Sequence, residues 1–310
     1  MTASRIRYAR LATERVNPRS RALDRLTPRE IAALMNREDR RAVLAVGRVR
    51  RQIAAAVDMI VAALRGGGRL FFVGAGTSGR LGVLEAAECP PTFGTPRGLV
   101  QAIIAGGRGA VFRSREGAED DEVAARRAVR ARVRGGDVVV GISASGVTPF
   151  VRAALAAAKG RGATTVLIAC NAEGPLRRPH GRRTTHLRIV PATGPEVLAG
   201  STRLKAGTAT KLVLNTLTTA SMTGLGRVYG NRMVDLQPRS AKLRERALRL
   251  VADLAGVSRG RALAALKASR GRVPVAVVMV RSGWGAVEAS RAVEAAGGSL
   301  RVALQKLRRK

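Results

Sequence analysis

Aromatic residues, cysteine and histidine are scarce in this chain. Phe, Trp and Tyr make up 3% of its 310 residues, so a core must be built mainly from Ala, Val and Leu. Two cysteines, Cys89 and Cys170, give neither a disulfide framework nor a CxxC zinc site. The only histidines, His180 and His186, are read as surface residues. We therefore expect no metal and no cofactor.

Long apolar runs are missing as well. The longest, such as residues 273–280, fall well short of the ~18 residues that a membrane span needs. The basic start, with Arg5, Arg7 and Arg10, has no apolar stretch behind it, as a secretory signal would. We expect no membrane segment, and the reducing cytoplasm is the expected compartment.

Acidic residues are few beside basic ones. The chain has 21 Asp and Glu against 56 Lys and Arg, a formal net charge of +35. Such a charge attracts polyanions. The basic residues are spread along the chain, however, and no aromatic stacking platforms interleave with them. We expect nonspecific adhesion to polyanions and no specific nucleic-acid site.

Hydrophobic periodicity predicts an α/β fold. A helix is expected at 30–64, with Gly47 weakening its continuity and a capping box at Thr27-Pro-Arg-Glu30. Apolar runs then alternate with helical patterns, which is typical of a parallel sheet covered on both faces. The expected strands are 69–76, 100–106, 137–143, 164–170 and 186–190, and the helices between and after them are 78–87, 119–134, 149–159 and 201–225.

Strand patterns fade after about residue 240. Short helices are expected at 243–254, 259–268, 273–280 and 285–296. We divide the chain into N-terminal helices (1–56), a three-layer α/β/α domain (57–225) and a small helical C-terminal region (226–310).

The first expected strand runs into a glycine-rich loop, Gly74-Ala-Gly-Thr-Ser-Gly79. It matches the dinucleotide fingerprint G-x-G-x-x-G, but the next strand ends in Ala105-Gly-Gly107 without the acidic residue that binds a ribose. What remains is an anion site, because glycines let backbone N–H groups approach an anion at a helix N-terminus. Thr77 and Ser78 add hydroxyl donors.

A second loop of this kind follows a later strand. Gly141-Ile-Ser-Ala-Ser-Gly-Val-Thr148 precedes a helix that starts at Pro149. Ser143 is a poor nucleophile-elbow serine, because position 145 is not glycine and no histidine has a suitable acidic partner. Two such loops at the carboxyl ends of strands favour a phosphate cradle. Tight connections with capping serines are the alternative. The candidate contacts are Thr77, Ser78, Ser143, Ser145 and Thr148.

Glutamates supply the candidate acid–base chemistry. Glu88 lies where prolines are expected to stop a helix, and the helix dipole there would raise its pKa. Glu116 and Glu119 come just before another helix, and an acid such as Glu119 at a helix start matches the helix dipole without any catalytic role. Composition and spacing do not choose between solvated and catalytic carboxylates.

The longer motifs resemble the N-acetylmuramic acid 6-phosphate etherase family. The resemblance covers nearly the whole chain and rests on 13–18 (TERVNP), 74–82 (GAGTSGRLG), 87–94 (AECPPTFG), 116–120 (EGAED), 194–196 (GPE), 200–209 (GSTRLKAGTA), 229–231 (YGN) and 233–235 (MVD). It implies a sugar isomerase (SIS) domain, which binds phosphosugars as a three-layer α/β/α sandwich, followed by a small helical domain. The reaction implied is cleavage of a D-lactyl ether, giving N-acetylglucosamine 6-phosphate and D-lactate.

The resemblance also implies roles for individual residues. Glu88 matches the acid that assists lactate departure, and Glu119 matches the second catalytic carboxylate, the base at carbon 2. Glu196, Thr202 and Arg203 are weaker candidates for lining the site. SIS domains commonly pair, which implies a homodimer. A non-catalytic phosphosugar-binding regulator is the alternative.

Two features depart from the family pattern. Val147 stands where a polar or basic residue is expected, and the net charge of +35 is higher than expected of such an enzyme. The charge could strengthen phosphosugar capture, and it could also lower the pKa of both catalytic carboxylates.

Overall fold

The computed structural model describes residues 11–172, 185–238 and 240–307. The chain forms two compact units. The first comprises Met1–Ala86 and Gly98–Thr218, and the second comprises Ala87–Arg97 and Thr219–Lys310. His180 lies outside the described residues, whereas His186 is exposed, as predicted.

Two helices open the first unit. Helix α1 (Pro28–Arg48) has the predicted capping box: Thr27 Oγ1 accepts the Glu30 N–H at 3.3 Å, and Glu30 Oε2 accepts the Thr27 N–H at 2.8 Å. The single helix predicted over 30–64 is wrong, because α2 (Arg50–Arg65) starts after a break at Val49. The break follows Gly47, whose conformational freedom weakens a helix interior.

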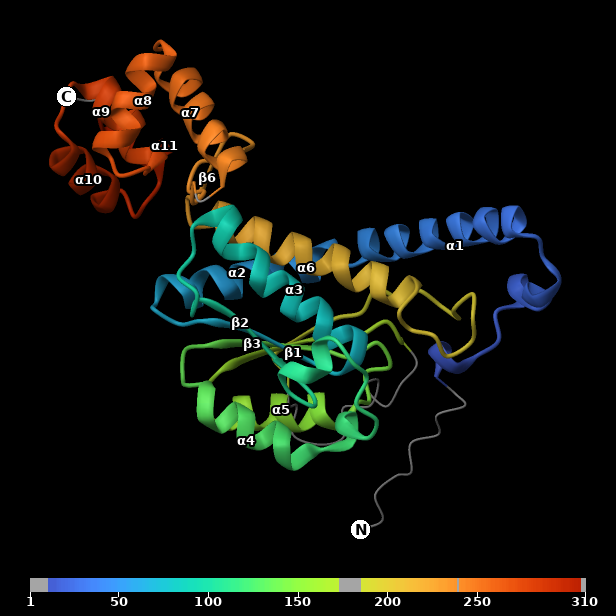
Figure 1. The fold of residues 1–310 in the computed structure, drawn as a ribbon. Coiled ribbons are helices and arrows are strands. Elements are labelled where there is room, and N and C mark those ends of the chain that lie inside the picture. The colour runs from blue at the N-terminus through green and yellow to red at the C-terminus, as the bar shows by residue number, and fades with distance from the viewer. Residues whose placement is uncertain (1–10, 173–184, 239, 308–310) are drawn as a thin grey trace. The chain divides into compact units, whose positions relative to one another are not determined.

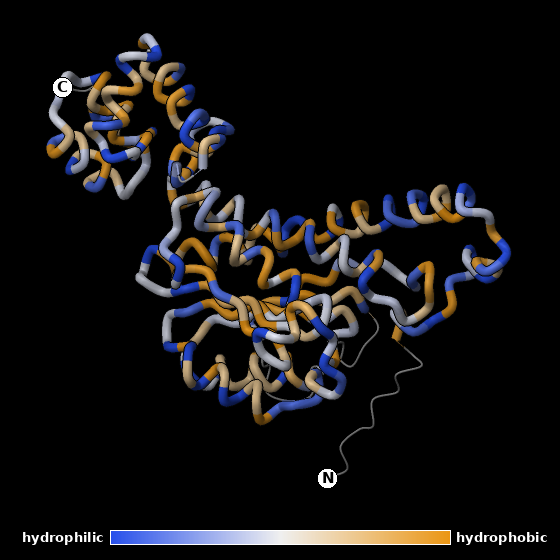
Figure 2. Tube along the Cα trace, viewed as in Figure 1, coloured by the Kyte–Doolittle hydropathy of each residue, from blue (hydrophilic) through white to orange (hydrophobic). Residues whose placement is uncertain are grey.

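A five-stranded parallel sheet forms the centre of this unit. Its strands are β1 (Leu70–Gly74), β2 (Val100–Ile104), β3 (Val138–Ile142), β4 (Thr164–Ile168) and β5 (Leu187–Ile189), in the order β2-β1-β3-β4-β5. Every residue of β1 and β3 is buried, as expected of strands covered on both faces. Figure 2 shows these strands as hydrophobic segments.

Helices cover both faces of the sheet (Figure 1). On one face lie α4 (Glu122–Arg132) and α5 (Pro149–Gly160), over a core that includes Phe71 and Leu155. On the other lie α2, α3 (Gly76–Phe93) and α6 (Lys205–Gly224). The predicted three-layer fold is confirmed.

Three predicted helix boundaries are wrong. Helix α3 does not stop before Pro90 and Pro91 but continues to Phe93, with both prolines confined to its last turn. Helix α4 begins at Glu122, where the Asp121 carboxylate caps it by accepting the Ala124 N–H at 2.8 Å. Helix α6 begins at Lys205, four residues later than predicted.

The second unit is mainly helical, as predicted. It contains α7 (Ala241–Ala255), α8 (Arg259–Ala268), α9 (Val273–Ser282), α10 (Ala286–Ala295) and α11 (Leu300–Leu307). These helices enclose a core of small apolar side chains such as Val251, Val277 and Val293. A two-stranded hairpin, β6 (Val228–Tyr229) and β7 (Arg232–Met233), was not predicted. None of the helices described in either unit is both long and apolar enough to span a membrane.

Candidate functional site

The two hydroxyl-rich loops lie next to each other at the carboxyl edge of the sheet. Strands β1 and β3 are parallel neighbours, with Gly74 paired to Ile142 at their ends. The loop after β1 enters α3, and the loop after β3 enters α5. The pairing places the candidate contacts on one edge, where ligands of open α/β sheets bind.

Glycines in the first loop bring α3 against the sheet. A Cβ on Gly74 would lie 2.6 Å from the Gly79 nitrogen, and one on Gly79 would lie 2.6 Å from Ile104 Cγ1. Close packing therefore requires both glycines. The first N–H groups of α3 have no carbonyl partner within the helix, which makes its start suited to an anion. Thr77 and Ser78 are half-buried in this first turn.

The second loop is held by its own hydroxyl groups. Ser143 Oγ accepts the N–H of Gly146 at 3.1 Å and lies 2.8 Å from Thr148 Oγ1. Ser145 Oγ accepts the Val147 N–H at 3.3 Å. Val147, which departs from the family pattern, has a buried side chain. An apolar residue therefore suits this position. These bonds preorganise the three hydroxyls before any ligand binds.

A cavity of about 180 Å³ lies beside the start of α3. It is lined by Gly76 from the first loop and by both Glu116 and Glu119. Glu119 belongs to a short 3₁₀ turn, Ala118–Asp120, and its side chain is exposed. The fold thus brings the predicted base to the glycine-rich loop. It brings Glu116 there as well, so the choice of Glu119 rests on its place in the motif.

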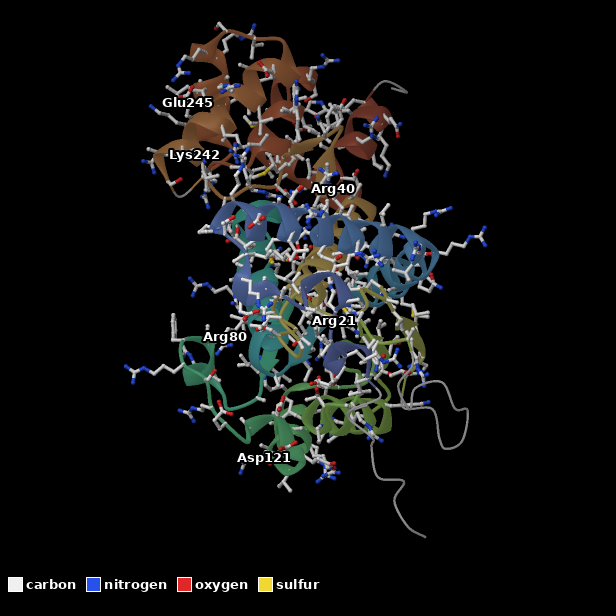
Figure 3. All side chains as sticks on the ribbon, turned by 90° about the vertical axis from the view of Figure 1, so that its right-hand side faces the viewer. Arg21, Arg40, Arg80, Asp121, Lys242 and Glu245 are labelled. Carbon is white, nitrogen blue, oxygen red and sulfur yellow. The ribbon has the colours of Figure 1, made fainter. Side chains whose placement is uncertain are left out.

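Sequence reasoning missed two arginines in this cavity, Arg80 and Arg115. Arg80 on α3 (Figure 3) donates from Nε to the Val111 carbonyl at 2.9 Å and ties the helix to the segment that precedes Glu119. A Cβ on Gly109 would lie 2.9 Å from Arg115 Nη2, so the Arg115 side chain packs against the backbone of Gly109. Arg80 lies inside the 74–82 motif, and its place in that motif could have identified it as a site residue.

Glu88 lies on α3 within the second unit. Its side chain is exposed, while Cys89 beside it is buried. The expectation that prolines stop the helix here is wrong, since α3 continues for five residues beyond Glu88. Burial within this chain does not desolvate the Glu88 carboxyl.

Glu196 caps helix α6 from inside the protein. Its fully buried carboxylate accepts the N–H groups of Lys205 and Ala206, each at 2.9 Å. Burial raises the pKa of Glu196 in spite of these bonds. The two carboxylate oxygens are thus engaged by the helix, and a substrate contact from Glu196 stays a prediction.

The start of α6 approaches the first loop. A Cβ on Gly207 would lie 3.5 Å from the Thr202 carbonyl oxygen and 3.8 Å from Thr77 Cγ2. Thr202 is half-buried and Arg203 is exposed. The turn that carries these two weaker candidates is therefore near the loop. Across residues 11–172, 185–238 and 240–307, no three His, Cys, Asp or Glu side chains gather as metal ligands would.

Curated relatives match nearly the whole chain. The N-acetylmuramic acid 6-phosphate etherase of Gloeobacter violaceus is 53% identical over 96% of this chain and 96% of its own length. The enzyme of that name from Geobacillus thermodenitrificans is 50% identical over 95% of this chain and 99% of its own length. The chain belongs to the N-acetylmuramic acid 6-phosphate etherase family. The resemblance seen in the motifs is confirmed.

Family models also match the central region of this chain. The glucokinase regulatory protein N-terminal SIS domain matches residues 52–159, and the SIS domain matches residues 117–220. Among solved structures, a phosphoheptose isomerase from Francisella tularensis aligns with a TM-score of 0.49 and 16% identity, covering 65% of this chain and 98% of that chain. The SIS-domain match agrees with the parallel sheet described above.

Proposed function

We propose that this chain is a carbon–oxygen lyase that cleaves the D-lactyl ether of N-acetylmuramic acid 6-phosphate. The products are D-lactate and N-acetylglucosamine 6-phosphate. The observation that carries the proposal is identity of 53% and 50%, over nearly full length, to proteins named for this etherase. The hydroxyl-lined edge and the neighbouring cavity with Glu119 support it.

The phosphate binds at the paired loops. Thr77, Ser78, Ser143, Ser145 and Thr148 offer hydroxyl groups there. The starts of α3 and α5 add backbone N–H groups and the positive ends of their dipoles. In this proposal, phosphate recognition rests on these hydroxyl and backbone N–H donors and on the helix ends. The surplus of basic residues adds long-range attraction for the dianion.

Glu119 removes the proton from carbon 2. In the open-chain sugar, the adjacent aldehyde makes this proton acidic. A carboxylate base suits the step, and a positioned base contributes about 10²–10⁴-fold to such a proton transfer. The electron pair released from the C2–H bond forms the C2=C3 double bond as the C3–O bond breaks.

Glu88 gives a proton to the departing lactate oxygen. Water then adds across the double bond, with its oxygen going to carbon 3 and a proton to carbon 2, and both carboxyl groups return to their starting forms. Glu88 is exposed in the single chain. In this proposal it collects the proton that it delivers when the sugar ring opens.

The proposal extends to assembly and setting. A homodimer, in which a second chain completes the site, is the proposed form. The reaction is placed in the bacterial cytoplasm, in recycling of cell-wall amino sugars. Both cysteines, Cys89 and Cys170, are free and buried, which suits a reducing compartment.

The test is to incubate the purified full chain with N-acetylmuramic acid 6-phosphate and measure both products. Equal amounts of D-lactate and N-acetylglucosamine 6-phosphate are expected. A folded chain that binds the phosphosugar but releases no lactate would contradict the enzyme and favour a non-catalytic regulator.

A further inference from the structure

A second cavity, of about 300 Å³, lies at the carboxyl ends of β4 and β5. Cys170 and Ala172 follow β4, Thr193 and Gly194 follow β5, and Arg41 of α1 also lines the cavity. The cavity shares no lining residue with the one that holds Glu119. None of the mechanism above uses it.

The cavity adjoins the second phosphate loop without being part of it. The Cys170 N–H donates to the Ala144 carbonyl at 2.9 Å, and Asn171 Nδ2 donates to the Ser145 carbonyl at 3.4 Å. Residues 170–171 therefore stand between the loop and the cavity. They hold the two neighbouring sites in a fixed relation.

Its wall is positively charged. Arg41, Leu44 and Arg48 lie on one face of α1, at helical spacings of three and four residues, and all three line the cavity. Among the described residues, neither arginine makes a hydrogen bond or ion pair, and no acidic residue lines the cavity. Glu38, one turn from Arg41, is already bound by Lys205 and Asn17. Both arginines thus line the space, and the acidic group that interacts electrostatically with Arg41, Glu38, lies outside the lining and is shared with Lys205.

The floor carries an unused hydrogen-bonding group. Thr193 is 3% exposed, and its hydroxyl has no hydrogen-bond partner among the residues that the structure describes. Leaving a buried hydroxyl unpaired costs free energy unless a ligand satisfies it. Burial also raises the pKa of the Cys170 thiol to about 12, so no thiolate opposes a bound anion.

We propose that this cavity binds a compact oxyanion, a carboxylate or phosphate group, between Arg41, Arg48 and the Thr193 hydroxyl. Guanidinium groups suit such oxygens because their N–H donors match the planar geometry of a carboxylate or the edge of a phosphate. The space is several times the roughly 30 Å³ share of one water molecule, so the anion enters with part of its hydration shell.

Equilibrium dialysis of the full chain at fixed ionic strength tests the site, with inorganic phosphate, D-lactate and neutral glycerol as separate probes. The double variant Arg41→Ala/Arg48→Ala is expected to bind the oxyanion about tenfold or more weakly than wild type. The control Arg40→Ala/Arg51→Ala removes the same charge from exposed residues outside the cavity (Arg40, Figure 3) and is expected to bind like wild type.

Two further variants separate this site from the phosphate loop and from folding. Ser143→Ala/Thr148→Ala removes two hydroxyl groups of the loop. This variant is expected to bind the oxyanion at the arginine-lined cavity as tightly as wild type. Thr193→Val is expected to weaken binding while leaving the thermal midpoint equal or higher, because it removes an unpaired buried hydroxyl.

Whichever probe binds identifies the source of the oxyanion. Unchanged binding of both anions by Arg41→Ala/Arg48→Ala, or an equal loss in the Arg40→Ala/Arg51→Ala control, would overturn the proposal. Binding is measured without turnover. A chain that releases no lactate would thus refute the proposed etherase and leave this result standing.

Discussion

Lys205 on α6 donates from Nζ to Oε2 of Glu38 on α1 at 2.5 Å, and the two side chains are 1% and 2% exposed. Asn17 Nδ2 donates to the same oxygen at 2.9 Å. One buried charge pair therefore joins the N-terminal segment, the first helix and a helix that starts beside the phosphate loops. Such a pair is sensitive to the loss of either partner, since the survivor is left as an uncompensated buried charge.

Replacing one partner of this pair is expected to destabilise the fold strongly. Lys205→Met should lower the free energy of unfolding by about 3–5 kcal/mol, measured by urea denaturation. The double variant Glu38→Leu/Lys205→Met should recover much of that loss, because it removes both charges. If the double variant loses as much free energy of unfolding as the two single variants together, this account is contradicted.

Asp137, which directly precedes β3, is expected to make the stability of the fold depend on pH. Burial raises the pKa of Asp137, but hydrogen bonds from Arg69 and from the Arg134 and Arg69 N–H groups outweigh burial and hold the pKa below 3.8. A carboxyl with a lowered folded-state pKa contributes stability above its unfolded pKa, and loses it as pH falls through the folded value.

The test compares wild type with Asp137→Asn by urea denaturation from pH 7 to pH 2.5. A stability difference of about 1–3 kcal/mol is expected at neutral pH. It should stay constant down to about pH 5 and shrink at lower pH. A difference that does not change with pH would show that the charge of Asp137 is irrelevant.

Two helical glycines should respond oppositely to the same substitution. Gly79→Ala should lower the free energy of unfolding by about 1–3 kcal/mol, since the new Cβ would lie 2.6 Å from Ile104 Cγ1. Gly47→Ala meets no atom within 4 Å and should raise it by about 0.5–1 kcal/mol. Chemical denaturation measures both, and equal effects of the same sign would refute this packing.

Arg80 is expected to act as a positioning residue. Arg80→Ala removes the bond to the Val111 carbonyl that anchors the segment before Glu119. Lactate release per unit time should fall about tenfold, with little change in the thermal midpoint. Arg113→Ala, an exposed residue of the same segment outside the cavity, is the control. Equal activity of the two variants would exclude the role.

The apolar strands made the sheet predictable. Val138–Ile142 is continuously apolar and is followed by a turn sequence. In an α/β pattern such a run is typical of a strand that is buried on both faces. The helix ends were harder, because they depend on distant partners. The start of α6 is set by Glu196, whose carboxylate lies nine positions before the N–H group of Lys205. The residues next to the start of α6 do not predict that cap.

The site was predictable where topology alone brings residues together. Parallel neighbours must place Ser143 and Thr77 on the same edge, whatever their side chains do. The Arg80 contact could not be derived, because it depends on how the segment after β2 folds back on α3. Nor could the surroundings of Glu88, since the exposure of its side chain follows from packing rather than from its motif.

The most direct measurement follows D-lactate release from N-acetylmuramic acid 6-phosphate by wild type and by Glu88→Gln, Glu119→Gln and Glu116→Gln. Glu116 lines the same cavity as Glu119 and is the matched control. Release should fall by about 10²-fold or more in the first two variants and stay near wild type in the third. Full activity of Glu119→Gln, or loss in Glu116→Gln alone, would contradict the assignment of Glu119 as the base.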